Sequence, residues 1–185
     1  AEPFMREALA IRRAALPAGH PDIAESLNTL GDLLQSQDRP AEAEPILREA
    51  LAIRRAALPA GHPYIGTELN NLGCFLLYGQ HKPADAEPLL REALEIFRAA
   101  LPADHPSIAN TLSHFGRVQQ ALGKTAEARA SWDEAINILR KGDPQGSAVL
   151  ARALGRSGTG RFQNGDAAAA LPELEESVSM GEKFL

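Results

Sequence analysis

The sequence has 185 residues, with 19 Lys and Arg against 24 Asp and Glu for a net charge of −5, a length that suits one domain or an array of small repeats. Alanine and leucine together fill 58 positions and aromatic residues only 5%. Because both abundant residues favour helices, the composition indicates an all-α fold and argues against a β-sandwich or barrel. The mildly acidic balance, without a cluster of Lys and Arg, gives little support for binding nucleic acid or an anionic membrane surface.

A single cysteine, Cys74, excludes an intrachain disulfide and a zinc site built from several thiolates. No stretch of about 18 apolar residues is present, and the first residues lack the basic and apolar regions of a signal peptide. We therefore predict a protein of a reducing compartment, the cytoplasm. Because the chain has no initiator Met, we also expect it to be a fragment of a longer protein.

An internal repeat organises the chain. Residues 1–21 and 43–63 are identical at 19 of 21 positions, and residues 86–106 match the second copy at 17 of 21. The first spacing is 42 residues and the second is 43, because the turn around His81 carries one extra residue. This self-similarity predicts an array of units of about 42 residues.

Each unit divides into two predicted helices. The first begins at a His-Pro pair, because proline fits the first helical position. A glycine recurs within it, and since a mid-helix glycine costs about 1 kcal/mol relative to alanine, its recurrence indicates that two helices approach closely there. The second helix has a proline near its start, Pro45 or Pro88, where we expect a local irregularity. The recurring residues are His20, His62 and His105, followed by Gly31, Gly73 and Gly116.

These motifs resemble tetratricopeptide repeats of the 42-residue type found in kinesin light chains and in many bacterial proteins. They are LNTLG and LNNLG (27–31 and 69–73), AEAEPILREALAIRR (41–55), and GHPDIA and DHPSIA (19–24 and 104–109). The resemblance is specific for residues 1–140 and weaker beyond. It implies a right-handed α-solenoid of antiparallel helix pairs, in which the first helices line a concave groove and the second helices form the convex back.

The resemblance predicts one array of nine helices over residues 1–185. Its parts are the second helix of a truncated repeat (1–17), three repeats (21–58, 63–101 and 106–141) and a degenerate closing repeat (144–185). In the closing repeat Asp143 and Pro144 imitate the His-Pro start, and either Gly155 or Gly158 takes the place of the recurring glycine.

The start of the chain departs from the pattern as well. Residue 1 corresponds to residue 43, so the chain begins in mid-repeat, and we expect upstream sequence that carries the missing first helix. Without that helix, the apolar face of Phe4, Leu9 and Ile11 needs another cover.

Residues that carry chemistry are few. His20, His62 and His105 are candidates for a metal site, but equivalent residues of neighbouring repeats lie about 10 Å apart at ordinary helix spacing, too far to share one zinc ion, so we assign them to helix starts. No HExxH, GxSxG or P-loop pattern is present, and the glycine-rich segment 155–160 lacks the Lys-Ser/Thr of a phosphate loop. Cys74 has no positioned His partner that would make it a nucleophile. We predict no enzymatic activity, no cofactor and no metal.

The resemblance also implies which residues face the groove. With the recurring glycine as position eight, positions two, five, nine and twelve share one helix face, which lines the concavity in tetratricopeptide proteins. A carboxamide both donates and accepts hydrogen bonds, so Asn28 and Asn70 suit the backbone of an extended peptide; the alternative is that they are ordinary solvated residues. Cys74 falls on the same face. The predicted groove residues are Glu25, Asn28, Asp32, Gln35, Thr67, Asn70, Leu77, Asn110, Ser113, Arg117, Gln120 and Arg152.

Charge along the predicted wall is uneven. Glu25 and Asp32 lie near the first full repeat, whereas Arg117 and Arg152 belong to the third and fourth, so we expect the C-terminal half to favour an acidic segment of ligand; arginines scattered by chance are the alternative. Family members that clamp chaperone tails use Lys and Asn where this chain has Asn28 and Asp32, which disfavours that ligand. The groove is instead similar to that of kinesin light chains, which captures short linear peptides.

The sequence thus predicts a protein–protein interaction scaffold that binds a short linear peptide or a partner protein in its groove. The alternative is a regulatory or oligomerising arm of a larger signalling or protease protein, because arrays of this type are frequently fused to such domains. The start in mid-repeat favours a larger parent, and it leaves self-association through the exposed N-terminal end open.

Overall fold

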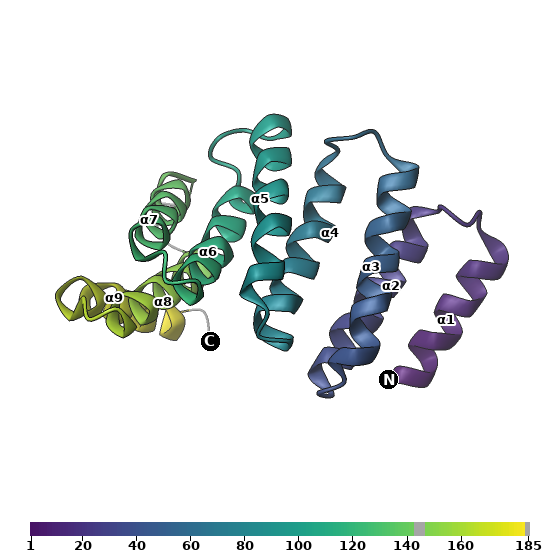
Figure 1. The fold of residues 1–185 in the computed structure, drawn as a ribbon, viewed down its shortest axis with the longest axis horizontal. Helices are drawn as coiled ribbons and strands as arrows, with labels where there is room; N and C mark the ends of the chain where they lie inside the picture. Colours follow the sequence, from purple (N-terminus) through teal and green to yellow (C-terminus); the bar gives the residue numbers. More distant parts are fainter. Residues whose placement is uncertain (143–146, 184–185) are drawn as a thin grey trace. The chain divides into compact units, whose positions relative to one another are not determined.

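The computed structural model describes residues 1–142 and 147–183, and these form nine α-helices without a strand (Figure 1). Asp143 and Pro144, the predicted start of the closing repeat, lie outside the described residues. A short π-helix, η1 (Phe75–Gly79), follows the fourth helix directly. The α-helices are α1 (Glu2–Ala15), α2 (Pro21–Ser36), α3 (Pro40–Ala57), α4 (Pro63–Cys74), α5 (Pro83–Ala100), α6 (Pro106–Ala121), α7 (Thr125–Gly142), α8 (Ala148–Gln163) and α9 (Ala167–Lys183).

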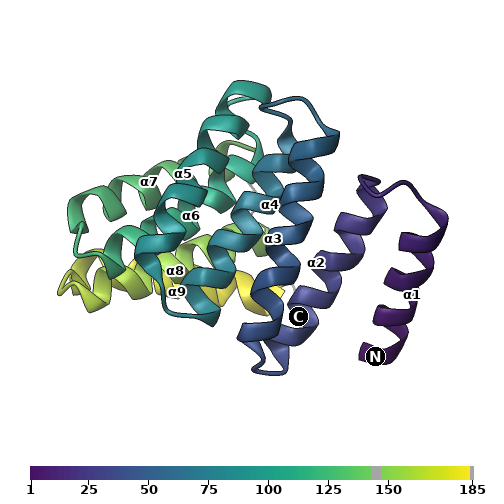
Figure 2. The same cartoon turned by 45° about the vertical axis from the view of Figure 1, so that its right-hand side comes forward.

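The chain forms two compact units, Ala1–Ala100 and Leu101–Leu185. In unit 1, α2 packs against α3 and α4 against α5, while α1 lies beside α2 (Figures 1 and 2). In unit 2, α6 packs against α7 and α8 against α9, and α8 also contacts α6 and α7. Unit 1 therefore contains two helix pairs and α1, and unit 2 contains two helix pairs.

The His-Pro pairs begin helices, as predicted. His20, His62 and His105 are the residues that precede the first turns of α2, α4 and α6. In each case the imidazole Nδ1 accepts a hydrogen bond from the backbone N–H two residues later, at 3.1–3.2 Å. This bond pairs one of the backbone donors that a helix start leaves unsatisfied, so the three histidines stabilise helix ends.

The recurring glycines mark the closest approach of the two helices in a pair. A Cβ added at Gly31 would lie 2.6 Å from Leu47 Cδ2, and one at Gly73 would lie 2.8 Å from Leu90. In the closing repeat Gly158 makes the same approach, 2.7 Å to Leu174 Cγ, whereas Gly155 faces Ser177. The structure therefore resolves the alternative left open by the sequence in favour of Gly158.

Trp132 takes the place of these leucines in unit 2. Its buried indole lies between two glycines, so that a Cβ at Gly116 of α6 would lie 2.6 Å from Cδ1, and a Cβ at Gly160 of α8 would lie 2.7 Å from Cζ2. The indole N–H donates to the carbonyl of Ser113 at 3.3 Å, which pairs its one polar atom. Two glycines are needed here because one large ring fills the space between α6 and α8.

The prolines of the second helices do not interrupt them. We expected an irregularity at Pro45 and Pro88, but α3 and α5 continue through these residues to Ala57 and Ala100. Each proline is the sixth residue of its helix, so the single backbone hydrogen bond that it removes is close to the helix start. The packing of the apolar face outweighs that loss.

The extra residue of the second full repeat lies in a π-turn. In the first repeat the N–H of Arg39 donates to the carbonyl of Leu34, five residues earlier, whereas the equivalent bond joins Lys82 to Leu76 across six. The added residue widens the last turn of the helix into η1, and His81 keeps the positive φ that Asp38 has in the first repeat. The insertion thus lies before His81, within the helix.

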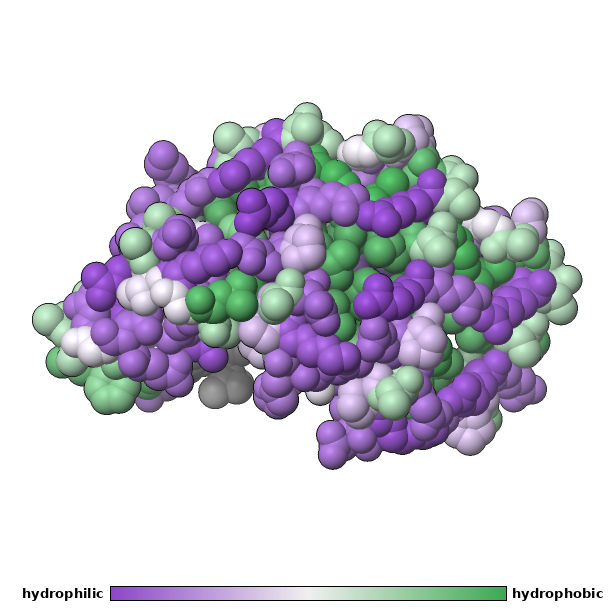
Figure 3. Space-filling view, viewed as in Figure 1, coloured by the Kyte–Doolittle hydropathy of each residue, from purple (hydrophilic) through white to green (hydrophobic). Residues whose placement is uncertain are grey.

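The second helices are joined by ion pairs that repeat along the chain. Arg13 of α1 pairs with Glu49 of α3, and Arg55 of α3 pairs with Glu92 of α5, at 2.5 and 2.7 Å. These side chains reach solvent, so each pair adds at most about 1 kcal/mol. Over α3 to α5, Figure 3 shows hydrophobic surface between strips of hydrophilic side chains.

Candidate functional site

The predicted groove residues of unit 1 come from α2, α4 and η1, and a buried polar contact joins α2 to α4. The Asn28 Nδ2 donates to Glu68 Oε2 at 2.6 Å, and Arg54 Nε lies 3.2 Å from Glu68 Oε1. Glu68 is only 3% exposed, and the Arg54 guanidinium lies 5.0 Å from the ring centre of Tyr64. Side chains of α2, α3 and α4 therefore meet at the Glu68 carboxylate, and this carboxylate holds the Asn28 side chain in place.

This contact fixes the orientation of the Asn28 carboxamide. An ionised carboxylate only accepts hydrogen bonds, so the NH₂ group of Asn28 must point to Glu68 and its carbonyl oxygen must point away. That oxygen, Oδ1, is buried and has no partner among the described residues, and the same holds for Asn70 Oδ1. A buried polar atom without a partner costs free energy, so a donor that reached either oxygen would recover that cost.

Burial changes the titration of the two acids beside this wall. Burial raises the pKa of Glu68, and the hydrogen bonds from Asn28 and Arg54 oppose the shift by stabilising the charged form. Loss of solvation also raises the pKa of Asp32, whose side chain still reaches solvent. The negative charge of this wall is therefore costly to the folded unit.

The remaining predicted residues of unit 1 differ in what they offer. Glu25 and Thr67 are exposed, and the Thr67 hydroxyl donates to the Pro63 carbonyl of its own helix. Gln35 is half-buried, and Leu77 is buried within η1. Cys74 is half-exposed.

In unit 2 two of the predicted residues, Arg117 and Gln120, form a second polar cluster. Arg117 donates to Gln120 Oε1 at 2.8 Å, and Gln120 Nε2 in turn donates to the Gly160 carbonyl at 3.0 Å. Ser113 is buried and its hydroxyl donates to the carbonyl of Ala109. Asn110 is half-buried and Arg152 is exposed. The two arginines thus supply positive charge to the predicted groove face of this unit, Arg117 hydrogen-bonded to Gln120 and Arg152 exposed to solvent.

Two buried charged groups were missed by the sequence analysis. The first group is Glu68 with Arg54, which lie 14 residues apart. The equivalent residues of the preceding repeat, Arg12 and Ser26, have the same spacing and are also in contact, with Arg12 Nη1 donating to Ser26 Oγ at 2.6 Å. This repeated spacing was the sequence pattern that could have indicated the pair. The other is Arg161, which pairs with Glu173 at 3.1 Å and with Asp133. No repeat pattern predicts Arg161, because the closing repeat is degenerate.

In the part of the chain that the structure describes, no group of three or more His, Cys, Asp or Glu side chains could hold a metal ion. No described helix is long and apolar enough to cross a membrane.

These repeated helix pairs, with polar side chains on the first helices, define an α-helical repeat scaffold. Profiles of the tetratricopeptide repeat family match residues 1–22, 23–64 and 65–141, so the chain belongs to the tetratricopeptide repeat family. The predicted all-α solenoid class is confirmed, as is the likeness to repeats of the kinesin light chain type. A family of this kind supports a general role in protein interaction.

Solved structures share the fold at low sequence identity. BtubC (BKLC) from P. vanneervenii is 22% identical with a TM-score of 0.79, covering 100% of this chain and 73% of its own. A Podosopora anserina protein with nearly identical TPR-like repeats of a kinesin light chain is 20% identical with a TM-score of 0.77, covering 97% and 84%. YrrB, a TPR protein with an unusual peptide-binding site, is 20% identical with a TM-score of 0.61, covering 96% and 78%. No curated protein matches the sequence significantly.

Proposed function

We propose that the protein is a non-catalytic scaffold that binds a short extended peptide against α2 and α4 of unit 1. The observation that carries the proposal is the pair of buried, unpartnered oxygens, Asn28 Oδ1 and Asn70 Oδ1. Backbone N–H groups of a peptide are donors of the required kind, and they recur along any extended segment whatever its side chains. The asparagines would therefore hold the peptide backbone, and neighbouring side chains would select its sequence.

Glu68 acts in this proposal as a positioning residue. It accepts the NH₂ group of Asn28 and is itself held by Arg54, so the carbonyl oxygen of Asn28 is presented in one orientation before a ligand arrives. A preorganised acceptor loses less side-chain freedom on binding than a mobile one. The likeness to YrrB, whose name records a peptide-binding site, supports the same class of ligand.

For unit 2 taken by itself, we propose a preference for acidic residues. Arg117 and Arg152 are both cations that a carboxylate can approach, and unit 2 would bind an acidic segment with charge-assisted hydrogen bonds. An acidic segment is therefore the ligand that we propose for unit 2. The single cysteine, Cys74, supports a cytoplasmic location for this activity.

The test is a peptide-library selection against the wild-type protein and an Asn28→Ala/Asn70→Ala variant, compared at equal folded content by circular dichroism. An enriched motif that disappears in the variant supports the proposal. Asn70→Ala alone is a second test, because it removes an acceptor without a described partner. Asn137→Ala, at an exposed position of α7, is the matched control and should keep the motif. Peptides that bind all variants equally would contradict the proposal.

A second candidate function is a regulatory or oligomerising arm of a larger protein. The observation that favours it is the apolar surface of α1, where Phe4 is 76% exposed and Ile11 61%. An arm would use this end for contacts, including self-association, and sedimentation of the chain at several concentrations measures that directly. A monomer at all concentrations, combined with an asparagine-dependent peptide motif, would favour the scaffold.

A further inference from the structure

The buried polar atoms that unit 1 leaves unpaired are hydrogen-bond acceptors. Among the described residues of this unit, Asn28 Oδ1 and Asn70 Oδ1 are the buried side-chain atoms without a partner. The donors beside them are already used, because Asn28 Nδ2 donates to Glu68 Oε2 and Arg54 Nε donates to Glu68 Oε1. A ligand of this face therefore has to bring donors.

Two acidic residues lie on the same face of α2 as Asn28. Glu25 precedes Asn28 by three residues and Asp32 follows it by four, and these spacings bring side chains to one side of a helix. Both acidic side chains reach solvent. Within residues 1–142 and 147–183, neither carboxylate forms an ion pair or a hydrogen bond. We call Glu25, Asn28 and Asp32 the α2 row.

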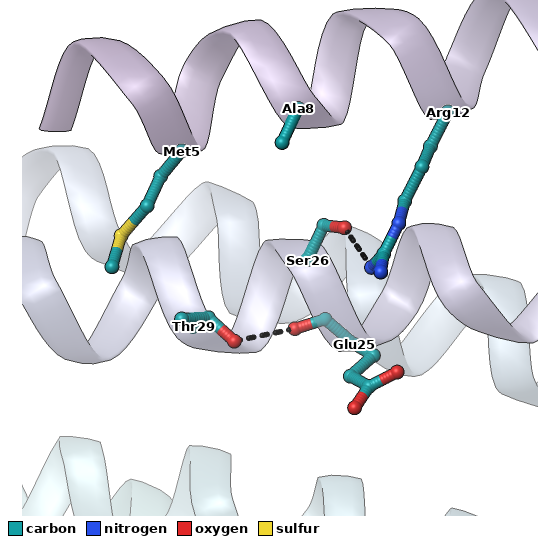
Figure 4. Close-up of a pocket in the computed structure, with 6 residues that line it drawn as sticks. All are labelled: Met5, Ala8, Arg12, Glu25, Ser26 and Thr29. Atoms are coloured by element: carbon teal, nitrogen blue, oxygen red, sulfur yellow. Dashed lines mark hydrogen bonds between the residues drawn. The ribbon is translucent and has the colours of Figure 1, made fainter. Parts of the chain in front are cut away.

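The arginine of α1 that reaches α2 does not neutralise this row. Arg12 Nη1 donates to Ser26 Oγ at 2.6 Å and to the Asp22 carbonyl at 3.0 Å. Figure 4 shows the Arg12 guanidinium directed at Ser26, while the Glu25 carboxylate points away from α1. The α2 row therefore keeps its negative charge.

Asp32 lies where a cation would stabilise the folded unit most directly. Burial, and to a smaller extent the charge of Asp32, raises the pKa of Glu68, so the two carboxylates are close enough to interact. Arg54 pairs with Glu68, and loss of solvation raises the pKa of Asp32. A cation against Asp32 would offset both the repulsion and the lost solvation, through charge-assisted hydrogen bonds.

We propose that unit 1 selects a peptide with a basic residue, and that the cationic group of this residue pairs with the Asp32 carboxylate. The inference rests on the proposed function, in which Asn28 and Asn70 hold the backbone of the same peptide. Asn28 and Asp32 are one helical turn apart, about 5–6 Å between Cβ atoms, so a long side chain of a residue held at Asn28 can reach Asp32. Guanidinium and ammonium groups bring several donors and no acceptor, as the unpaired atoms of this face require.

The test compares the motif that the peptide-library selection enriches with the wild type and with Asp32→Asn, at equal folded content. We expect arginine or lysine at one fixed position with the wild type. With Asp32→Asn that position should lose its preference, while the rest of the motif remains, because the asparagines are unchanged. A motif without a basic residue, or with an acidic one at that position, would overturn the inference.

A synthetic peptide with the enriched motif, titrated by fluorescence anisotropy, measures the contact itself. Asp32→Asn should bind it about tenfold more weakly than the wild type does. Replacing the basic residue of the peptide by glutamine should cost about the same with the wild type and little further with Asp32→Asn, since both changes remove one interaction. Asp85→Asn is the matched control, because it changes the net charge equally at an exposed position of α5, a helix without predicted groove residues. It should bind as the wild type does.

The outcomes separate this inference from the function on which it rests. An asparagine-dependent motif that binds Asp32→Asn and the wild type equally overturns the role of Asp32 and leaves the proposed peptide binding intact. Equal weakening by Asp32→Asn and Asp85→Asn also overturns it, because the effect would then come from net charge. The absence of any asparagine-dependent motif overturns both proposals.

Discussion

Gly160→Ala should destabilise unit 2, although it replaces a poor helix former by the best one. The new Cβ would lie 2.7 Å from Trp132 Cζ2 and 2.8 Å from Cζ3, well inside van der Waals contact. The rigid indole cannot move aside, because Gly116 already lies against its other edge. Overpacking at such a site costs about 2–3 kcal/mol, and the helix preference returns about 1 kcal/mol, so the net loss of unfolding free energy is about 1–2 kcal/mol.

Urea unfolding followed by circular dichroism measures this loss. Gly181→Ala is the control, because nothing lies within 4 Å of a Cβ at that position of α9, and it should be neutral or stabilise by up to about 1 kcal/mol. In a Trp132→Leu background, which restores the residue type of Leu47 and Leu90, Gly160→Ala should lose its penalty. The reasoning is refuted if Gly160→Ala stabilises the wild-type protein as much as Gly181→Ala does.

Three further results are expected. Gly73→Leu should overpack against Leu90 and lower the unfolding free energy by about 1–3 kcal/mol, and an unchanged urea midpoint would contradict the assigned helix contact. Burial and the charge of Arg156 lower the pKa of His114 to about 3, so below about pH 6.5 protons bind the unfolded chain in preference to the folded one. Between pH 7 and pH 5 the wild type should therefore lose about 2 kcal/mol more unfolding free energy than His114→Asn, and equal losses would show that His114 titrates normally. Arg117→Glu should weaken binding of an acidic peptide by roughly tenfold at low ionic strength and much less at high salt, whereas equal weakening at both would remove its electrostatic role.

Local features of the repeat were predictable from the sequence. The His-Pro pairs predict helix starts because all the interactions involved are local. The histidine accepts a hydrogen bond from the N–H two residues later, and the proline between them suits the first helical position. The glycines give close helix contacts because only a residue without Cβ fits against Leu47 or Leu90, and the recurrence at 42 residues showed the position. Both features depend on short stretches that the repeats copy.

Features that depend on several repeats at once were not predictable. The orientation of Asn28 depends on Glu68, 40 residues later, and on Arg54, and neither residue belongs to the predicted groove face. The prediction of an irregularity at Pro45 was wrong for the converse reason. The lost backbone hydrogen bond is a local cost that the sequence shows, but the packing of α3, which the sequence does not show, outweighs it. The sequence also could not decide which glycine of the closing repeat is equivalent to Gly31. That choice depends on the contact between Gly158 and Leu174, which is defined only when α8 and α9 are packed together.

The indole of Trp132 also makes the repeats distinguishable during folding. Nearly identical copies can exchange places, and misassembly between copies is a characteristic failure of repeat proteins. Trp132 fits between Gly116 and Gly160, but the residues equivalent to Gly160 are Phe75 in η1 and Leu33 in α2. If α7 took the place of α3 or α1, its ring would meet a large side chain instead of a glycine. One tryptophan thus encodes the correct neighbours of α7 in a chain whose other second helices α1, α3 and α5 have nearly the same sequence.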